Sequence, residues 1–444
     1  MSLFKCLNGF LITIVTSFYF FPFTLRFLPG VNTKMFLAGI GVVLCGINIA
    51  KGRAAKIDRS LFSLSVAAIF VSVAAFLSVT INNTNDYTYA SYIISMWVWL
   101  GGAYTVVQLM KWMYGQVTVA MVCKFLIMVC FMQCVLALII DANAGFKMFV
   151  DSVVADLGFV QMDKLDTSNR LYGIGCSLDV AGTRFAAILA AIPLLTIKAI
   201  SEDDTKCIWG YIISFVFITI IGNMISRTST IGVLVAFFIW GVYIFRPSYS
   251  QYVRGLWSRM TVVVIIAIVI SIVLYNNSEV FRSNIRFAFE GFFSLFETGV
   301  WETNSNNMLK EMFVLPDNTH TWLIGDGYMY DPAGVNPYYV GDNYPGYYMN
   351  TDVGYLRFIF YFGIIGLSAI ICYFVVITRL LVNKFCDYKM VFYTFLLINL
   401  IVWIKVSTDI FPVFAIFLCV PNAIGGNEDD SKQYENSLSD PLDI

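Results

Sequence analysis

The sequence predicts an all-α integral membrane protein, and three observations lead to that fold class. Of the 444 residues, 59% are hydrophobic and only 13% are charged, whereas about 25% of the residues in a soluble domain are charged. The mean hydropathy is +0.75. Apolar runs of about 20 residues, the length of a membrane-spanning helix, recur along the chain. The net charge of −1 excludes bulk electrostatic attraction to nucleic acid, so no nucleic-acid partner is expected.

Twelve apolar runs are expected to form transmembrane helices. The first follows Lys5 as a signal peptide would, but it is long and aromatic and lacks a small-residue cleavage site, so we interpret it as a membrane helix. The runs cover approximately residues 8–28, 35–50, 60–81, 91–110, 117–140, 180–200, 207–226, 228–245, 260–275, 353–378, 389–405 and 410–423. The last run is short and contains Pro421, which makes it the least regular.

Lysine and arginine set the orientation of such a bundle, because they are enriched in short cytoplasmic loops. With the N-terminus inside, most of them fall in inner segments. The short outer loops then carry only Arg26, Lys34, Arg227 and Lys405. Both termini are therefore expected in the cytoplasm, in a multi-pass protein of the bacterial inner membrane.

The predicted helices divide the chain into four parts. Residues 1–275 hold the first nine helices and a long outer segment at 141–179. Residues 276–352 form an extracytoplasmic loop subdomain, 353–423 hold the last three helices, and 424–444 form an acidic cytoplasmic tail. The subdomain begins with a predicted amphipathic helix of the kind that lies in the membrane interface. Its apolar positions at helical spacing are Phe281, Ile285, Phe289, Phe292 and Phe296.

Arginine is concentrated at the predicted outer surface, where positive charge is normally depleted. Six positions share this placement: Arg170, Arg184, Arg227, Arg282, Arg286 and Arg357. For each arginine taken alone, an anchor to lipid headgroups and a functional role explain its position equally well. For the set we favour an anion-binding site, because the planar guanidinium suits bidentate contacts to phosphate. Arg227 is the clearest case, since the segment GNMISRTSTIGV forces it to the tip of a tight hairpin at membrane level.

A tyrosine-rich stretch at residues 322–358 indicates a second chemical feature. Eight tyrosines, among them Tyr347, Tyr348 and Tyr355, alternate there with aspartates. Aromatic faces beside carboxylates suit sugar rings, although a tyrosine belt at the membrane interface has the same composition. His320 is the only histidine, and the ten cysteines form no CxxC or Cys/His cluster, so no metal site is predicted.

Three stretches resemble the O-antigen polymerase and ligase superfamily, the Wzy-type and WaaL-type membrane glycosyltransferases. They are RLYGIGCSLDVAGTRFA (170–186), ISRTSTIGVLVAF (225–237), and LIGDGYMY followed by NTDVGYLRFIFYFGIIGL. Their order and their placement relative to the late large loop are also similar. The resemblance covers about residues 165–380.

The resemblance implies transfer of a glycan from undecaprenyl diphosphate to a hydroxyl group outside the inner membrane, with no cofactor or metal. Arg170 and Arg227 would stabilise the diphosphate, and Asp352 would be the third catalytic residue. Asp179 and Glu290 are alternatives for the base. The other expected substrate-binding residues are Arg184, Arg282, Arg286, Arg357, Asp179, Tyr347, Tyr348 and Tyr355.

Two departures from the family pattern bear on this expectation. Asp352 stands where ligases commonly have a histidine, which favours a polymerase of O-antigen, capsule or exopolysaccharide over a lipopolysaccharide ligase. Eleven residues, rather than the ten of some polymerases, separate Arg170 from Gly182. Expected partners are an undecaprenyl-diphosphate-linked oligosaccharide, membrane lipids, a chain-length regulator and a flippase. The alternatives are an O-antigen ligase, a flippase or other transporter, which would usually show two related halves, and a non-enzymatic scaffold.

Overall fold

The computed structural model describes residues 3–51, 59–156, 170–202, 204–332 and 346–421, and almost all of its regular elements are helices. The expected acidic tail and part of the 141–179 segment lie outside the described residues. The helices that occupy the predicted apolar runs are α1 (Leu3–Phe20), α2 (Thr33–Ala50), α3 (Arg59–Ile81), α4 (Tyr92–Tyr114), α5 (Val119–Ala142), α8 (Leu178–Ser201), α9 (Thr205–Ile225), α10 (Ser229–Ile244), α11 (Pro247–Asn277), α16 (Gly354–Lys384), α17 (Lys389–Val402) and α18 (Phe411–Leu418).

The remaining elements are short. They are β1 (Thr24–Leu25), α6 (Ala144–Val153), β2 (Val154–Asp156), α12 (Glu279–Ala288), α13 (Glu290–Thr298), α14 (Asn304–Glu311), α15 (Thr319–Leu323) and two 3₁₀ turns, η1 (Tyr348–Asn350) and η2 (Cys386–Tyr388). Strands β1 and β2 pair antiparallel.

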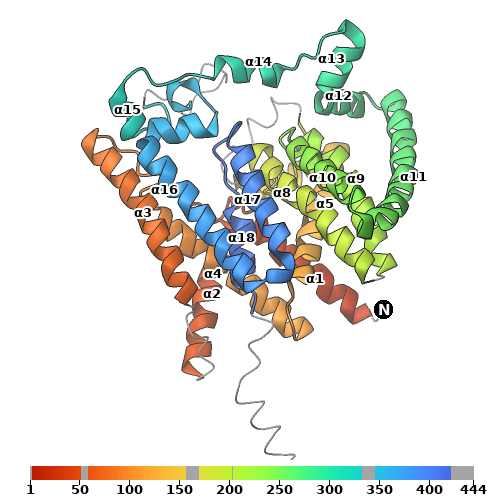
Figure 1. The fold of residues 1–444 in the computed structure, drawn as a ribbon, viewed down its shortest axis with the longest axis horizontal. Helices are drawn as coiled ribbons and strands as arrows, with labels where there is room; N and C mark the ends of the chain where they lie inside the picture. Colours follow the sequence, from red (N-terminus) through yellow and green to blue (C-terminus); the bar gives the residue numbers. More distant parts are fainter. Residues whose placement is uncertain (1–2, 52–58, 157–169, 203, 333–345, 422–444) are drawn as a thin grey trace, which may run out of the picture.

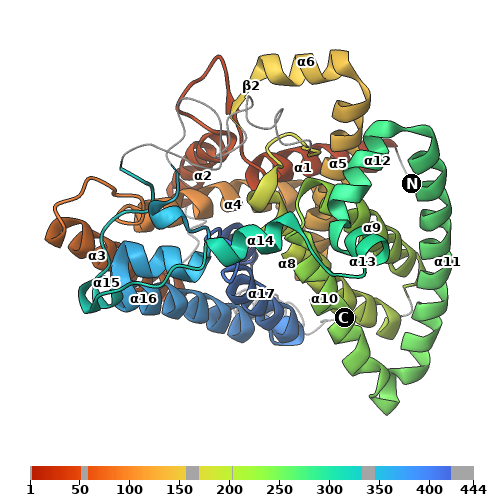
Figure 2. The same cartoon turned by 90° about the horizontal axis from the view of Figure 1, so that it is seen from above.

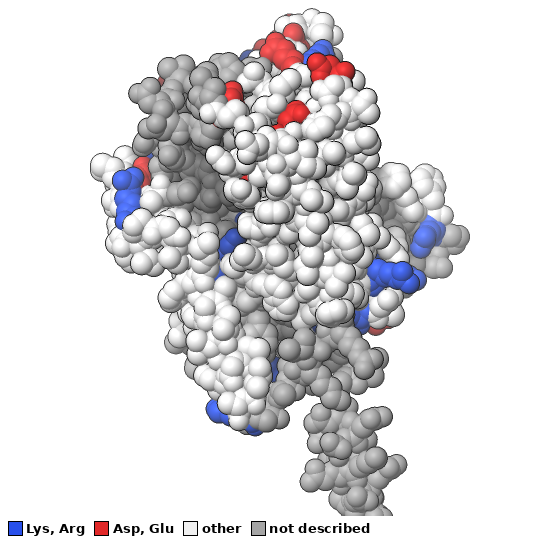
Figure 3. Space-filling view, turned by 90° about the vertical axis from the view of Figure 1, so that its left-hand side faces the viewer, with Lys and Arg blue, Asp and Glu red and all other residues white. Residues whose placement is uncertain are grey.

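Eight helices in the described part of the chain are long and apolar enough to cross a membrane, which indicates a multi-pass membrane protein. The predicted all-α membrane class is therefore confirmed at this level. Each of the twelve predicted runs contains a helix, but α10, α17, α18 and the described part of α1 are shorter than a full span. The count of twelve spans stays a prediction. One side of the molecule carries few charged side chains between its two ends (Figure 3).

Helix α8 is the centre of the bundle, and its apolar window is entirely buried. It packs against α9, α10 and α17. Close approach of α8 to the α9–α10 turn and to α10 depends on glycine. A Cβ on Gly182 would lie 2.4 Å from Ser226 Oγ in the turn, and a Cβ on Gly232 in α10 would lie 2.3 Å from the Ala186 carbonyl oxygen. Small residues at such crossings let helix backbones pack tightly in membranes. This packing holds the α9–α10 turn against the first turns of α8.

Helices α12, α13, α14 and α15 lie across one end of the bundle, which we call the loop end (Figures 1 and 2). The predicted single amphipathic helix is wrong in one respect: α12 and α13 are separate helices, and the chain leaves helical geometry at Phe289 (φ −115°, ψ 29°). Phe281 and Ile285 pack against the core, whereas Phe292 and Phe296 are exposed. The predicted apolar stripe is therefore not continuous: its α12 half faces the core, and its α13 half faces outward.

Helix α16 is interrupted at Phe362 and Gly363, where Gly363 has φ +66°. A side chain there would meet the backbone of Leu323, so the break lets the α15 segment pack directly onto α16. The amide nitrogens of Asp326 and Gly327 donate to the carbonyl oxygens freed by the break, those of Phe360 and Tyr361. The first two turns of α16 are thus a short separate helix that is held at the loop end.

The segment between α17 and α18, residues 403–410, is a non-helical stretch packed inside the protein. The amide nitrogen of Tyr355 donates to the Trp403 carbonyl oxygen at 3.0 Å, and Asn399 Oδ1 accepts from the Ile410 amide nitrogen at 3.0 Å. Its polar side chains are Lys405, Ser407, Thr408 and Asp409. Lys405, Ser407 and Asp409 contact different neighbours, so this segment is a polar connection among the apolar helices.

Candidate functional site

Arg227 lies at the loop end, in the three-residue turn between α9 and α10. Its guanidinium forms an ion pair with Glu290 at the start of α13 and lies 4.3 Å from the ring centroid of Phe287 in α12. The predicted hairpin tip is therefore covered by the α12–α13 pair. A cation over an aromatic face is attracted by the ring quadrupole, so Phe287 helps to keep the charge away from bulk water.

Arg170 lies beside the same aromatic ring. The Arg170 Cζ atom is 4.8 Å from the ring centroid of Phe287. Two arginines that are 57 positions apart in the sequence, the difference between 227 and 170, are thus brought together by one phenylalanine from a third segment. Two guanidinium groups repel each other, and a negative group beside them offsets that repulsion, as Glu290 does at Arg227.

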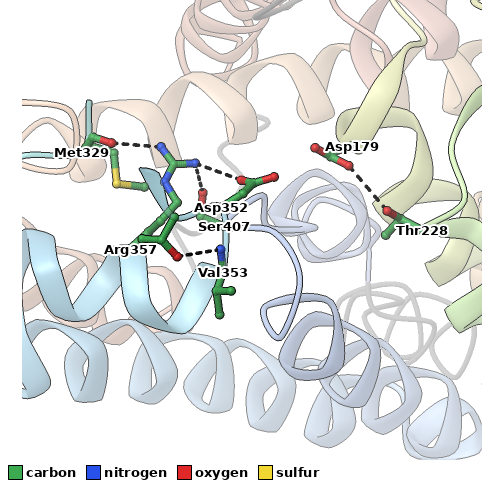
Figure 4. A network of polar contacts seen from close by, with 8 residues as sticks. Asp179, Thr228, Met329, Asp352, Val353, Arg357 and Ser407 are labelled. Atoms are coloured by element: carbon green, nitrogen blue, oxygen red, sulfur yellow. Dashed lines mark hydrogen bonds and ion pairs between the residues drawn. The ribbon is translucent and has the colours of Figure 1, made fainter. Parts of the chain in front are cut away.

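Asp352 and Arg357 form a second group of charges at the start of α16 (Figure 4). Arg357 donates to Ser407 Oγ at 2.7 Å and to the Met329 carbonyl oxygen at 3.2 Å, and it lies 3.6 Å from Asp352. Only 6% of the Arg357 side chain is exposed, against 20% for Asp352. Arg357 therefore holds the surrounding segments in place, and the more accessible Asp352 is the group that can meet a ligand.

Lys405 connects these two groups. Its Nζ atom donates to Thr228 Oγ1 at 3.3 Å, and the same hydroxyl donates to Asp179 Oδ1 at 3.5 Å. Thr228 follows Arg227 in the turn, and Asp179 is in the first turn of α8. Lys405 thus joins the α17–α18 segment to the α9–α10 turn and to α8.

The Lys405 ammonium also interacts electrostatically with Arg170, Arg227 and Asp352. Burial lowers the pKa of this ammonium group. Asp179 opposes the shift, and the two arginines add to it. We call Arg170, Asp179, Arg227, Glu290, Asp352, Arg357 and Lys405 the charged cluster.

Asp352 has an environment that suits proton transfer. Burial raises the pKa of its carboxyl group well above the usual range, and the negative charge of Asp179 raises it further. Arg357 and Lys405 oppose that shift. Figure 4 shows Asp179 and Asp352 on neighbouring segments of the same region. A carboxyl with a raised pKa is a better proton acceptor near neutral pH than an ordinary aspartate.

With every side chain ionised, the charged cluster has four cations and three carboxylates, so it holds net positive charge, and protonation of Asp352 increases that excess. Its cations come from four segments: the stretch before α8, the α9–α10 turn, α16 and the α17–α18 segment. Such convergence of guanidinium and ammonium groups is the arrangement that binds phosphate. Within the ranges that the structure describes, no three His, Cys, Asp or Glu side chains lie close enough together to hold a metal ion.

The three predicted tyrosines lie in different places. Tyr347 covers the charged cluster, since its ring centroid is 4.0 Å from Arg357 Cζ. Tyr348 donates to Asp326 Oδ2 at 3.3 Å and packs on Tyr328. Burial, followed by the charge of Asp326, raises the pKa of Tyr348 to about 12.

Tyr355 lies apart from the other two. It donates to the Leu400 carbonyl oxygen at 2.8 Å, which ties α16 to α17. Only Tyr347 therefore reaches the charged cluster through a contact with one of its members.

Arg282 and Arg286 have local partners on α11 and α13. Arg282 Nε donates to the Tyr275 carbonyl oxygen at 3.0 Å. Arg286 pairs with Glu297 at 2.8 Å, and hydrogen bonds to Glu297 and Tyr275 raise the pKa of Arg286. Both arginines join α12 to its neighbours, and the structure does not bring them to the charged cluster.

Arg184 belongs to a different buried group. It donates to the Phe20 carbonyl oxygen, and its Cζ atom lies 5.5 Å from the ring centroid of Trp99. Lys34 lies 4.3 Å from the same ring, and Asp409 interacts electrostatically with both cations. We call Lys34, Arg184 and Asp409 the inner charge group. It stabilises the far end of the 403–410 segment, two residues beyond Ser407.

The sequence analysis did not single out Lys405, Ser407, Asp409 or Phe287. Lys405 and Lys34 were visible only as exceptions to the positive-inside pattern. Three of the four basic residues expected in short outer loops, Lys34, Arg227 and Lys405, lie in one of the two charged groups. The fourth, Arg26, donates to the Val154 carbonyl oxygen at 3.3 Å. A lysine or arginine that departs from the positive-inside pattern was therefore the sequence feature that marked members of the buried charged groups.

The chain matches no protein family, no curated protein and no solved structure.

Proposed function

We propose that this protein is a membrane glycosyltransferase that polymerises a bacterial surface polysaccharide from polyprenyl-diphosphate-linked repeat units. The observation that carries the proposal is the charged cluster at the loop end. There Arg170, Arg227 and Lys405 come together beside Asp352. The same three stretches that resemble the O-antigen polymerase and ligase superfamily supply Arg170, Arg227 and Asp352.

The cations of the cluster are suited to hold a lipid-linked diphosphate. They lie at one end of a bundle whose helices are apolar enough for a membrane, so a lipid held there keeps its chain in the bilayer and its headgroup among the charges. Glu290 currently pairs with Arg227. A diphosphate carries more negative charge than one carboxylate and competes for this guanidinium on binding.

The proposed reaction is a displacement at the sugar carbon attached to the diphosphate. A hydroxyl oxygen of the acceptor repeat unit forms a bond to C1 of the donor sugar, and the bond between C1 and the phosphate oxygen breaks. The bonding electrons stay on the departing diphosphate, where Arg170, Arg227 and Lys405 stabilise the added charge. The hydroxyl proton passes to Asp352, which must be ionised at that moment.

Positioning supplies the other part of the rate enhancement. Donor and acceptor are both anchored in the bilayer, so binding at one site replaces a bimolecular encounter by a reaction between held groups. Tyr347 offers an aromatic face directly beside Arg357. It is placed to stack on a sugar ring of the glycan while the guanidiniums hold the phosphates.

Reconstitution tests the proposal against its rivals. The purified protein is placed in lipid vesicles with fluorescent undecaprenyl-diphosphate oligosaccharide from a strain that lacks the gene. A polymerase produces a ladder of longer lipid-linked chains. A ligase lengthens only an added lipid A-core acceptor, and a flippase moves label across the bilayer without a new bond. Absence of any ladder, with the wild-type protein folded and substrate present, contradicts the proposal.

A further inference from the structure

Helix α12 has two chemically different faces. Residues at i, i+3, i+4 and i+7 share a helix face, and one such face contains Val280, Ser283, Asn284 and Phe287. The opposite side carries Ile285, which lines an apolar groove together with Phe289 and residues of α9 and α11. One helix therefore separates an apolar groove from a polar region. Phe287, the ring beside Arg170 and Arg227, is at the end of the polar face.

A cavity of about 280 Å³ lies against this polar face. Its other walls are the end of α5, the start of α6 and residues 170–172. The polar members of the lining are Asp141, Lys147, Arg170, Tyr172, Ser283 and Asn284. The volume is just below the range of about 300–1,000 Å³ for drug-sized ligands, which is suitable for one sugar ring but not for an oligosaccharide.

Asn284 gives this cavity a feature that packing alone does not explain. Only 6% of the residue is exposed, and its side chain lines the cavity. Among the described residues, its side-chain amide makes no hydrogen bond. Most side-chain amides that are this far from solvent are paired within the protein. A largely buried amide that makes no hydrogen bond within the protein and lines a cavity is placed to bind a ligand there.

The cavity ends where the charged cluster begins. Arg170 belongs to both, since it lines the cavity and lies 4.8 Å from the Phe287 ring centroid. A ligand that fills the cavity therefore has its end next to the pair of guanidiniums. Carboxylate, ammonium, hydroxyl and amide groups around one small cavity suit the hydroxyl groups of a sugar, which both donate and accept hydrogen bonds.

We infer that this cavity binds the first sugar of the donor, the ring attached directly to the diphosphate. Asn284, Ser283 and Asp141 bind the ring hydroxyls, and Arg170 binds the phosphate next to C1. The inference rests on the proposed function, because it takes the diphosphate to lie at Arg170 and Arg227. It places the sugar that reacts on the α12 side of the cluster, while Tyr347 remains available to the acceptor.

Binding of three defined lipids to the full-length protein in nanodiscs tests the inference. The probes are undecaprenyl diphosphate and the same lipid carrying a single N-acetylglucosamine or a single galactose. The wild-type protein is expected to bind at least one sugar-bearing lipid about tenfold more tightly than the bare diphosphate. Asn284→Leu keeps the side-chain volume and removes the unpaired amide, so it is expected to fold normally and to lose that tenfold preference.

Two controls separate the possible failures. Asn306→Ala removes an exposed amide on α14, outside the cavity, and should keep the preference. Arg227→Ala should weaken binding of all three lipids. If wild-type protein binds the bare diphosphate and both sugar-bearing lipids equally, or if Asn284→Leu keeps the preference, the sugar cavity is wrong and the diphosphate site stands. If wild-type protein binds none of the probes, the proposed function fails as well.

Discussion

Lys405 donates a hydrogen bond to Thr228 over 3.3 Å, and through this contact the α17–α18 segment is joined to the turn that carries Arg227. The lysine also interacts with both predicted diphosphate arginines and with two aspartates, although it is a short-loop residue that no motif marks. Lys405 interacts both with the arginine pair, Arg170 and Arg227, and with Asp352. Its removal should therefore disrupt the charged cluster more directly than any other single change.

Lys405→Met is therefore expected to reduce polymer formation by about 100-fold, in the range that follows loss of one group stabilising transition-state charge. The methionine keeps most of the apolar stem and removes the ammonium. Polymer ladders from a complemented deletion strain, with protein levels measured by blot, give the result. Lys310→Met is the matched control, because Lys310 is an exposed lysine in the last turn of α14 and is not a member of the charged cluster. Normal ladders from Lys405→Met would remove Lys405 from the site.

Arg227→Lys should fail nearly as badly as Arg227→Ala, with a loss of about 100-fold in polymer formation. Lysine keeps the charge, but it cannot pair with Glu290, lie over the Phe287 ring and donate two parallel hydrogen bonds to phosphate. Arg286→Lys is the control, because that arginine forms an exposed ion pair outside the cluster. Full-length polymer from a normally expressed Arg227→Lys protein would mean that any cation suffices at this position.

Activity should fall as the pH is lowered through the raised pKa of Asp352. Below that pKa the carboxyl is protonated and cannot accept the acceptor's proton, and above it the base is ionised. The acid limb of kcat/KM is thus expected well above the ordinary aspartate range. Asp179→Asn removes a negative charge that raises the pKa of Asp352, so it should move the limb to lower pH. A limb that stays in place in Asp179→Asn, or persists in Asp352→Asn, would assign the titration to another group.

Replacing both Tyr347 and Tyr348 by alanine should weaken use of the glycan substrate without preventing membrane insertion. Stacking on an aromatic ring is worth roughly 1–3 kcal/mol in single-stranded nucleic acid complexes, which would raise KM by about 5- to 150-fold. Tyr347→Phe keeps the ring over Arg357 and should remain close to wild type. Tyr355→Phe loses only the bond to the Leu400 carbonyl oxygen. An unchanged KM in the double variant would mean that these tyrosines do not bind the glycan and instead belong to a tyrosine belt at the membrane interface.

Gly182→Ala and Gly210→Ala should change stability in opposite directions. A Cβ at position 182 would lie 2.4 Å from Ser226 Oγ and 2.8 Å from Thr228 Cβ, so the α9–α10 turn must move, at a cost of about 1–3 kcal/mol. Nothing lies within 4 Å of a Cβ at position 210, and alanine there should stabilise α9 by about 0.5–1 kcal/mol. Thermal unfolding in detergent measures both. If the Gly182→Ala and Gly210→Ala proteins melt at the same temperature, the α9–α10 turn accommodates the added methyl group without cost.

The apolar runs were predictable because each helix has to satisfy its own backbone in lipid, so length and composition are sufficient to find it. The structure has a helix in every predicted run, from α1 to α18. The break at Phe289 was not predictable from the apolar stripe. The stripe continues through both α12 and α13, and the break becomes evident only when Glu290 pairs with Arg227 on a distant turn.

The members of the site were only partly predictable for a similar reason. Arg227 could be placed, because a hairpin without a loop leaves its tip at the bundle end. The roles of Arg184 and Arg357 depend on how α8 and α16 are rotated about their own axes in the bundle. Arg184 points towards Phe20 and Trp99, and Arg357 is enclosed by Ser407, Met329 and Tyr347. A sequence gives the position of such a residue along a helix but not the neighbour that its side chain meets.

The segment between α17 and α18 has a consequence for how the chain assembles. At about 1.5 Å per residue, the eight residues of α18 span about 12 Å, well short of a hydrocarbon core of about 30 Å. Its side chains from Phe411 to Phe417 are all buried, and the adjoining non-helical backbone would expose unpaired amides to lipid if it stood alone. This part of the molecule is therefore stable only after α4, α5 and α16, the helices that α18 packs against, have assembled. Because α18 follows those helices in the chain, it is synthesised after them, and the charged cluster is completed only once this later segment has packed into place.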